Sequence, residues 1–195
     1  RDVDISLSLL RKIGKAENIG LPPLNRYLKT MQRATRDMVH AAAGAPYEEE
    51  LGSFTLWITE QLSMVTGEEL VTRTEELSTE IFRDVRNLSA KFTHHAHEIR
   101  KKLKQLYYWL KLCPVNPFFN KNQMKNLEDA LTALGNWHDH YVLQGKIRSF
   151  RKEYLVKGTA EHDHAKKLEE ITKLLQKQWL VGAEEKLAGL LNPLK

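Results

Sequence analysis

Apolar residues recur every three or four positions through almost all of this 195-residue chain, and this spacing constrains the fold more than any other feature. Residues three and four apart share one face of an α-helix, whereas a half-buried strand needs apolar and polar residues in alternation. No convincing alternating stretch occurs. The sequence predicts an all-α protein of antiparallel helical bundles, with helices over about 2–17, 24–43, 47–64, 67–91, 94–112, 120–156 and 159–191.

Prolines and a capping residue mark several of the expected helix boundaries. Pro22-Pro23 suits the first turn of a helix, because a proline there loses no internal hydrogen bond. Thr66 before Gly67-Glu68-Glu69 predicts a capped start, since its hydroxyl can accept from a free backbone N–H and acids favour the first turn. Cys113-Pro114 and Asn116-Pro117 are expected to end the helix before them.

The totals narrow the class of protein without identifying it. Cys113 is the single cysteine, which excludes an internal disulfide framework. No apolar run reaches the eighteen or so residues of a membrane-spanning helix, so we expect no membrane partner and a cytoplasmic location. The chain opens on Arg1-Asp2-Val3-Asp4 without an apolar leader, and we expect it to begin inside a longer natural chain. The net charge of +5 favours an anionic partner.

The segment from His94 to Leu112 separates its charges from its apolar residues. An arc of about 100° on the helical wheel holds all of its basic side chains but one, together with a histidine and a tyrosine. These residues are His97, Arg100, Lys101, Lys104, Tyr108 and Lys111. Almost opposite lie Ala96, Ile99, Leu103, Leu106 and Leu110. No acid of this segment falls inside the basic arc, and Glu98 and Lys102 flank it. Like charges at this spacing repel, so the arrangement predicts an anionic partner.

A second basic stripe has the same length. Its members, spaced three, four, three and four apart, are Arg26, Lys29, Arg33, Arg36 and His40. They stay within about 80° of arc along about 21 Å of helix, and His97 to Lys111 spans the same distance. Asp37 is the one nearby acid in the sequence and points elsewhere. Two stripes of equal length suit an extended polyanion better than a single phosphate, and the alternative for both is a plain solvated surface.

Two motifs resemble the landmarks of the CHAD family, the conserved histidine α-helical domain. The first is His97-x-x-Arg100-Lys101-x-Leu103-Lys104-x-Leu106-x-Tyr108. The second is Leu127-x-x-x-Leu131-x-x-Leu134-Gly135-x-x-His138-Asp139. The opening Arg1-Asp2-Val3-Asp4-Ile5 is similar to the close of the second landmark in a first helical half. The resemblance covers essentially the whole chain.

The resemblance implies two similar helical halves around a basic central channel that binds inorganic polyphosphate. A single CHAD-like domain would then occupy residues 1–195. The later helices of an incomplete first half would lie in 1–65, and a complete second half in 66–195. A cytoplasmic protein of this kind could be associated with polyphosphate granules.

The resemblance also assigns roles within this implied site. The arginines would pair with phosphate oxygens through two hydrogen bonds each, and the lysines would act as compact charges. His97 and Tyr108 would add a ring-nitrogen donor and a hydroxyl donor. Arg33 and Arg36 would supply the facing wall. A departure at Gln105 and Tyr107, where family members often place further basic residues, would lower the positive charge of the site.

Two other functions stay open. Histidines at 94, 95 and 97, at 138 and 140, and at 162 and 164 could belong to a metal-dependent phosphohydrolase of the His-Asp type. Histidines two residues apart point to different sides of a helix, however, and suit a shared metal poorly. Nucleic acid is the other alternative, because Tyr107, Tyr108 and Trp109 could stack on bases. We expect a non-enzymatic protein without a metal or cofactor.

Two further sets of residues are interpreted as structural. The first is an ordinary mixed surface on one helix side, made of Lys166, Glu169, Glu170, Lys173 and Lys177. The second is an aromatic part of the core, expected to hold Trp57, Tyr107, Trp137 and Trp179, with Trp109 at its edge.

Overall fold

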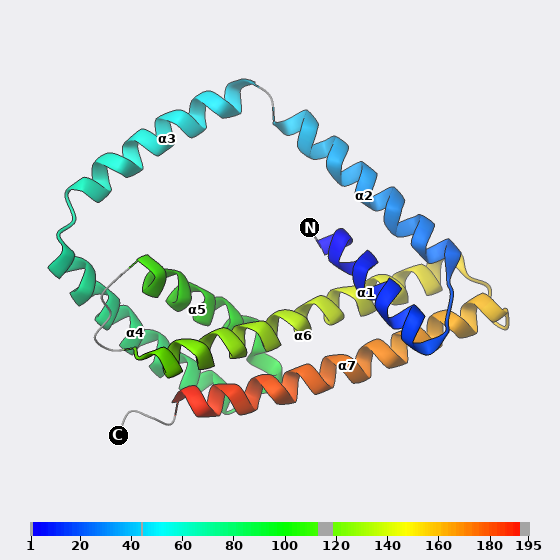
Figure 1. Cartoon of the computed structure of the whole chain (residues 1–195). Coiled ribbons are helices and arrows are strands. Elements are labelled where there is room, and N and C mark those ends of the chain that lie inside the picture. The colour runs from blue at the N-terminus through cyan, green and yellow to red at the C-terminus, as the bar shows by residue number, and fades with distance from the viewer. Residues whose placement is uncertain (1, 44, 113–118, 192–195) are drawn as a thin grey trace. The chain divides into compact units, whose positions relative to one another are not determined.

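A computed structural model describes residues 2–43, 45–112 and 119–191, with side chains for all of them except 45–50 and 62. These residues form seven α-helices and no strand, which confirms the all-α class (Figure 1). None of the described helices is long and apolar enough to cross a membrane. The helices are α1 (Asp2–Glu17), α2 (Pro22–Ala42), α3 (Ala45–Ser63), α4 (Gly67–Ser89), α5 (Phe92–Leu112), α6 (Lys121–Tyr154) and α7 (Ala160–Leu191). Arg1 and the predicted helix terminators Cys113-Pro114 and Asn116-Pro117 lie outside the described residues.

Local contacts fix several helix ends. The Thr66 hydroxyl accepts a hydrogen bond from the Glu69 N–H at 3.2 Å, and the Glu69 carboxylate accepts one from the Thr66 N–H at 2.9 Å. This capping box confirms the predicted start of α4. α1 ends at Glu17, and the next residue, Asn18, has a φ of 51°. The Ile19 N–H then donates to the Gly14 carbonyl at 2.9 Å. Gly14 is required there, because a Cβ would lie 2.7 Å from the Ile19 oxygen.

The chain divides into two compact units that interleave along the sequence. Unit 1 combines Arg1–Glu49 with Asn136–Gln178, and unit 2 combines Glu50–Gly135 with Trp179–Lys195. As a result, α3, α6 and α7 each contribute residues to both units. These compact units are not the two helical halves, 1–65 and 66–195, that the family resemblance implies. The single domain with these two halves stays a prediction.

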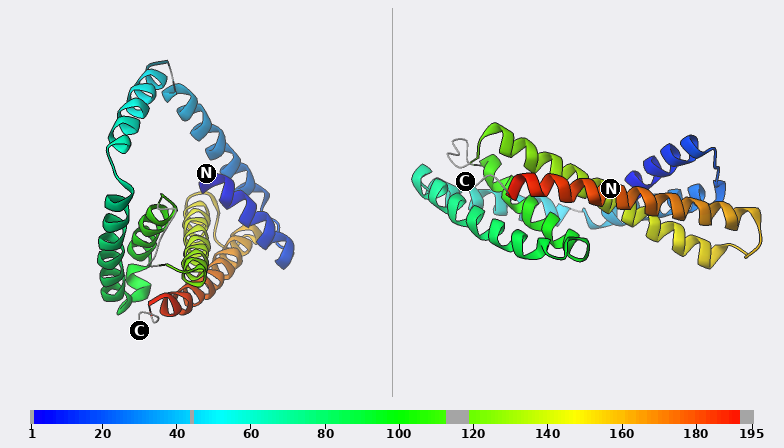
Figure 2. Two further views of the ribbon diagram at one scale, coloured as in Figure 1. Left: turned by 60° about the vertical axis from the view of Figure 1, so that its left-hand side comes forward. Right: turned by 90° about the horizontal axis from the view of Figure 1, so that it is seen from below.

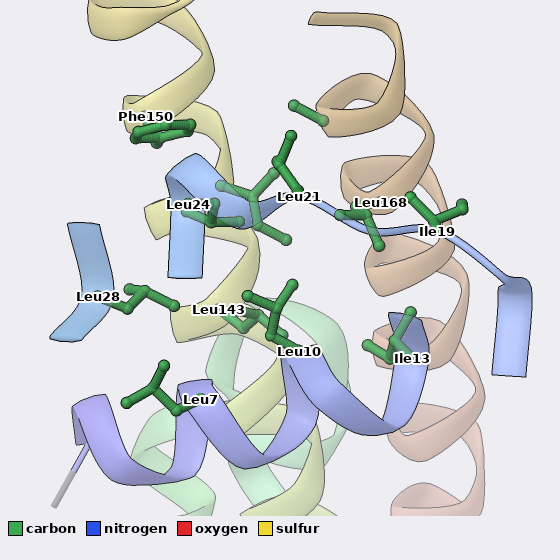
Figure 3. Packing of buried hydrophobic residues seen from close by; sticks show 12 residues of the cluster. Leu7, Leu10, Ile13, Ile19, Leu21, Leu24, Leu28, Leu143, Phe150 and Leu168 are labelled. Carbon is green, nitrogen blue, oxygen red and sulfur yellow. The ribbon is translucent and has the colours of Figure 1, made fainter. Parts of the chain in front are cut away.

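Unit 1 is built around one apolar cluster, most of which is drawn in Figure 3. Its buried members are Leu7, Leu10, Ile13, Ile19, Leu21, Leu24, Leu28, Leu143, Ile147, Phe150, Ala165 and Leu168. On α1, α6 and α7 these residues are three or four apart, so each helix turns one apolar face inward. Leu24 and Leu28 are fully buried, and this fixes the rotation of α2 about its axis.

In unit 2, α4 and α5 lie side by side (Figures 1 and 2). The buried apolar residues of α4 are Leu77, Ile81 and Val85, and those of α5 begin at Phe92 and recur to Leu110. Burial of one leucine or isoleucine side chain stabilises a fold by about 1.5–3 kcal/mol. The apolar contact between the two helices therefore decides which face of α5 meets solvent.

Candidate anion-binding surfaces

The outward face of α5 carries the predicted basic arc. The five apolar residues opposite it are buried, which confirms the division of the helix into two faces: Ala96, Ile99, Leu103, Leu106 and Leu110. Arg100 and Lys104 are half-buried, whereas the other four members are exposed. We call this set of residues the α5 stripe: His97, Arg100, Lys101, Lys104, Tyr108 and Lys111.

Three cations in the middle of the α5 stripe have no carboxylate partner within the described part of the chain. They are Arg100, Lys101 and Lys104. The Lys104 ammonium lies 5.6 Å from the centre of the Tyr108 ring, a distance at which a cation is attracted to an aromatic face. Among the described residues, therefore, no carboxylate would have to be displaced from these three cations by an incoming polyanion.

The C-terminal end of the α5 stripe differs, because α6 brings an acid to it. The Lys111 ammonium lies 3.5 Å from the Glu128 carboxylate and 5.2 Å from the centre of the Tyr107 ring. The Tyr107 hydroxyl donates to the same carboxylate at 3.2 Å. The pKa of Lys111 is raised, first by the Tyr107 hydroxyl and then by Glu128. No acid of α5 lies within the basic arc, as the sequence predicts. In the folded protein, however, Glu128 of α6 lies beside Lys111 at the end of the arc.

The residues that flank the α5 stripe make polar contacts with neighbouring side chains. The Lys102 ammonium donates to Asp84 of α4 at 2.6 Å, and this hydrogen bond is the main cause of the lowered pKa of Asp84. His95 Nδ1 lies 3.2 Å from the Glu98 carboxylate. The residues that flank the stripe therefore have partners, whereas Arg100, Lys101 and Lys104 at its centre have no carboxylate partner among the described residues.

The second stripe lies on the exposed side of α2, in unit 1. We call its members, Arg26, Lys29, Arg33, Arg36 and His40, the α2 stripe, and all five are exposed. The Arg36 guanidinium lies 4.0 Å from the carboxylate of Asp4 on α1, which also accepts a hydrogen bond from Gln32. That hydrogen bond is the first cause of the lowered pKa of Asp4. Like Lys111, Arg36 has gained an acid that its own helix does not contain.

The two stripes belong to different compact units, with the α2 stripe in unit 1 and the α5 stripe in unit 2. Each presents its cations on one helix face. Their convergence on a common channel stays a prediction of the family resemblance.

The family itself is decided by comparison with known protein families. A model of the CHAD domain matches residues 1–148 of the 195-residue chain. The chain belongs to the CHAD family. The matched part contains both stripes in full and ends within α6. No curated protein and no solved structure matches the chain significantly.

The second landmark of the CHAD domain occupies the first half of α6. Leu127 and Leu134 are fully buried, whereas Leu131 is half-buried. Further along, His138 and Asp139 are also half-buried, with 3.7 Å between ring nitrogen and carboxylate. The leucine spacing is thus explained by helix packing, and the polar pair ends the motif at the surface of the helix.

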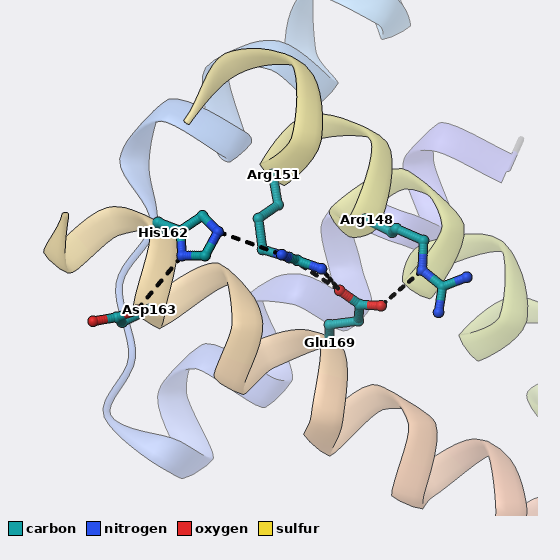
Figure 4. Close-up of polar contacts among 5 residues, drawn as sticks. All are labelled: Arg148, Arg151, His162, Asp163 and Glu169. Atoms are coloured by element: carbon teal, nitrogen blue, oxygen red, sulfur yellow. Dashed lines mark hydrogen bonds and ion pairs between the residues drawn. The ribbon is translucent and has the colours of Figure 1, made fainter. Parts of the chain in front are cut away.

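A third group of cations in this CHAD domain closes around a carboxylate (Figure 4). Arg148 Nε donates to Glu169 at 2.8 Å, and Arg151 donates to the other carboxylate oxygen through Nε at 3.2 Å and Nη2 at 2.9 Å. Glu169 is buried, so its interpretation as ordinary surface was wrong. Burial raises the pKa of Glu169, but the hydrogen bonds from both arginines outweigh burial and the pKa is lowered.

The aromatic core of the CHAD domain is smaller than the sequence suggests. Trp137 is buried as predicted, but Trp57 is 55% exposed and Trp179 is 37% exposed, so these two predictions were wrong. Tyr107 and Trp109 are both half-buried. An indole ring needs several neighbouring elements to cover it. Along α3, residues 51–61 are all exposed except the half-buried Ile58, and Trp57 has no such cover in the described residues.

Several histidines of the described residues take part in local contacts. No group of three or more His, Cys, Asp or Glu side chains lies close enough to hold a metal ion in residues 2–43, 51–112 and 119–191. The ring of His162 lies 3.5 Å from the carboxylate of its neighbour Asp163. His140 is buried, and its Nδ1 lies 2.7 Å from the Asn136 carbonyl. The clusters expected for a His-Asp phosphohydrolase are therefore not assembled by these residues.

Proposed function

We propose that this CHAD domain binds inorganic polyphosphate or a similar linear polyanion, without enzymatic turnover, and that the α5 stripe is its main contact surface. The observation that carries the proposal is the row of Arg100, Lys101 and Lys104, which no described carboxylate neutralises. The row projects from a helix whose opposite face is packed, so its spacing is fixed. A ligand with many anionic groups matches such a row better than a single phosphate does.

The side chains of the row suit phosphate oxygens in different ways. The planar guanidinium of Arg100 can donate two parallel hydrogen bonds to one phosphate group, whereas the ammonium groups of Lys101 and Lys104 act as compact charges. Neutralisation of phosphates releases condensed counterions, and this release makes binding of a polyanion strongly dependent on salt. The same chemistry would apply to polyphosphate by analogy with nucleic acids.

The α2 stripe would add contacts for long chains. Exposure of all five members leaves them accessible, and the family resemblance supports their use on the same ligand as the α5 stripe. Arg36 contributes least, because Asp4 already lies 4.0 Å from it. Arg26, Lys29 and Arg33 are the members expected to contribute most.

A titration with chains of increasing length tests the ligand class. Isothermal titration calorimetry at several salt concentrations would compare pyrophosphate, short polyphosphate, long polyphosphate and random single-stranded RNA. Affinity is expected to rise from pyrophosphate to long polyphosphate and to fall steeply with salt. Equal affinity for RNA and polyphosphate at matched charge would favour a nucleic-acid-binding module instead. Release of inorganic phosphate, with metal bound stoichiometrically, would contradict a non-enzymatic role.

A triple substitution tests the surface. Arg100→Ala, Lys101→Ala and Lys104→Ala together are expected to lower affinity for long polyphosphate by about 100-fold or more, because three charge-assisted contacts are lost. The slope of log affinity against log salt should shrink by about 2. The matched control is Lys166→Ala, Lys173→Ala and Lys177→Ala on α7, a mixed surface outside both stripes. Equal affinity of the two triple variants would refute the α5 stripe as the site.

A second triple substitution tests the contribution of α2. Arg26→Ala, Lys29→Ala and Arg33→Ala are expected to weaken binding of long polyphosphate while leaving short chains almost unaffected. If both chain lengths are bound as in the wild type, the α2 stripe is a solvated surface.

A further inference from the structure

Unit 2 contains a cavity that the polyphosphate proposal does not use. It encloses about 390 Å³ between α4, the segment that opens α6 and the last turn of α7. Pockets that bind small organic ligands measure about 300–1,000 Å³, so the cavity suits a ligand at the small end of that range. Its walls include Phe82 and Phe119, two arginines and two side-chain amides, all of which lie in unit 2.

The apolar part of the cavity contains two aromatic rings that are stacked on each other. The rings of Phe82 and Phe119 are 5.6 Å apart between centroids and only 13° from parallel. Both side chains are half-buried, so part of each ring stays accessible from the cavity. Flat aromatic surfaces attract the planar faces of nucleobases, and this stacking tolerates any base.

The charged part of the cavity comes from α4. Arg83 and Arg86 line the cavity, and among the described residues Glu75 is the one acid that lines it with them. The carboxylate nearest to Arg83, at 4.0 Å, is that of Asp84, which is already held by Lys102 at 2.6 Å. Within the described part of the chain, Arg86 makes one long contact, from Nη2 to the Leu191 carbonyl at 3.4 Å. Two guanidinium groups at the cavity are therefore available to an anionic group, for which they have the matching planar geometry.

Two amide side chains could read the edge of a ring. Gln123 lines the cavity, and its Oε1 accepts a hydrogen bond from the Asn120 N–H at 2.9 Å. This hydrogen bond does not use the NH2 group of Gln123. Asn87 lines the same cavity with both a donor and an acceptor. An asparagine amide can pair with the N6 and N7 atoms of adenine, which present an acceptor beside a donor.

We propose that this cavity binds a purine nucleoside monophosphate, with the base against Phe82 and Phe119 and the phosphate on Arg83 and Arg86. The cavity offers two aromatic rings, two guanidinium groups, and side-chain amides that donate and accept hydrogen bonds. A nucleotide has a counterpart for each of these three features. None of the residues concerned belongs to the α5 or α2 stripe. The proposal therefore stands or falls independently of polyphosphate binding.

Calorimetric titration of the whole chain with AMP tests the proposal, with adenosine and inorganic phosphate as comparison probes. AMP is expected to bind, adenosine at least about tenfold more weakly, and inorganic phosphate more weakly still, because each comparison probe lacks one of the two contacts. Absence of AMP binding at millimolar concentration would overturn the proposal.

Two variants place the ligand in the cavity. Arg83→Met with Arg86→Met should weaken AMP binding about tenfold or more, and Phe82→Leu, which keeps apolar bulk without a ring, should weaken it by a similar factor. Arg73→Met on α4, outside the cavity, is the matched control and should bind AMP normally. Wild-type affinity in the double arginine variant would overturn the assignment. AMP binding could also be lost in the triple α5 variant while the Arg83→Met, Arg86→Met variant binds AMP normally. That result would place AMP on the α5 stripe and would overturn the proposal as well.

Discussion

The α5 stripe and the arginine pair of α6 are both clusters of cations on helices, yet they differ in what faces them. Arg148 and Arg151 close on one buried carboxylate through three hydrogen bonds of 2.8–3.2 Å. Arg100, Lys101 and Lys104 face no carboxylate among the described residues. The first cluster joins two helices of unit 1, and the second leaves its charge available to a ligand.

This difference shows that a local count of charges cannot tell a structural cluster from a binding surface. Glu169 is separated from its two arginines by 18 and 21 residues, so no inspection of neighbours along one helix finds the pairing. On α7 itself, the neighbours of Glu169 are lysines, as on a mixed exposed surface. For this reason the sequence predicted an exposed Glu169. The deciding quantity is the presence of a carboxylate on the opposing helix.

The largest expected effect that separates the two clusters is on stability. Glu169→Ala should lower the free energy of unfolding by about 2 kcal/mol, because it leaves the mostly buried Arg151 without its acceptor. Affinity for polyphosphate should stay within about twofold of the wild type. Urea unfolding followed by circular dichroism, with calorimetry for binding, checks both. Glu76→Ala is the control, since its pair with Arg73 is exposed and worth at most about 0.5 kcal/mol.

The stability of the Arg148–Glu169–Arg151 cluster should depend on pH. The pKa of Glu169 is lowered in the folded protein, so the unfolded chain binds a proton at higher pH than the folded chain does. The stabilising contribution of Glu169 is complete at a pH above its pKa in the unfolded chain. It is lost as the pH falls through the lower pKa that Glu169 has in the folded protein.

The measurement is the difference in unfolding free energy between the wild type and Glu169→Gln from neutral to acidic pH. This difference should shrink on acidification. The triple α5 variant should show no such trend relative to the wild type, because arginine and lysine keep their protons throughout that range. A pH-independent difference for Glu169→Gln would mean that the buried carboxylate does not stabilise through its charge.

A smaller effect is expected where the α5 stripe meets Glu128. Glu128→Gln removes the carboxylate 3.5 Å from Lys111, which should raise polyphosphate affinity about threefold and steepen its salt dependence. Glu184→Gln on α7 is a control of equal charge change outside the stripe. An equal gain in both variants would show that net charge, rather than the release of Lys111, determines the affinity.

The smallest effect is expected at the flank of the stripe. Glu98→Gln breaks a contact between the exposed Glu98 and the half-buried His95, and such pairs near the surface contribute little because water and salt screen them. Polyphosphate affinity should change by less than about twofold in calorimetry. A change as large as that of Glu128→Gln would mean that acids anywhere near α5 compete with the ligand, and the distinction between its centre and its flanks would fail.

The helices and the faces of α5 could be predicted because their causes are local. Helix ends lie within two residues of their predicted positions, set by features such as the Thr66 capping box and Pro22 at the start of α2. The burial of Leu103 and Leu106 follows from spacing along a single helix. The predicted burial of Trp57 and Trp179 was wrong, because burial of a large ring depends on which other elements cover it.

By itself, the sequence determined that this chain is helical, where its helices begin and end, and that α5 turns a basic face away from an apolar one. Those properties depend on residues at most four positions apart. The tertiary structure alone decided which cations keep their charge uncompensated: Glu128 reaches Lys111, Asp4 lies near Arg36, and Glu169 binds Arg148 and Arg151. Ion pairs act over a few ångströms in space, and only packing brings distant parts of a chain that close.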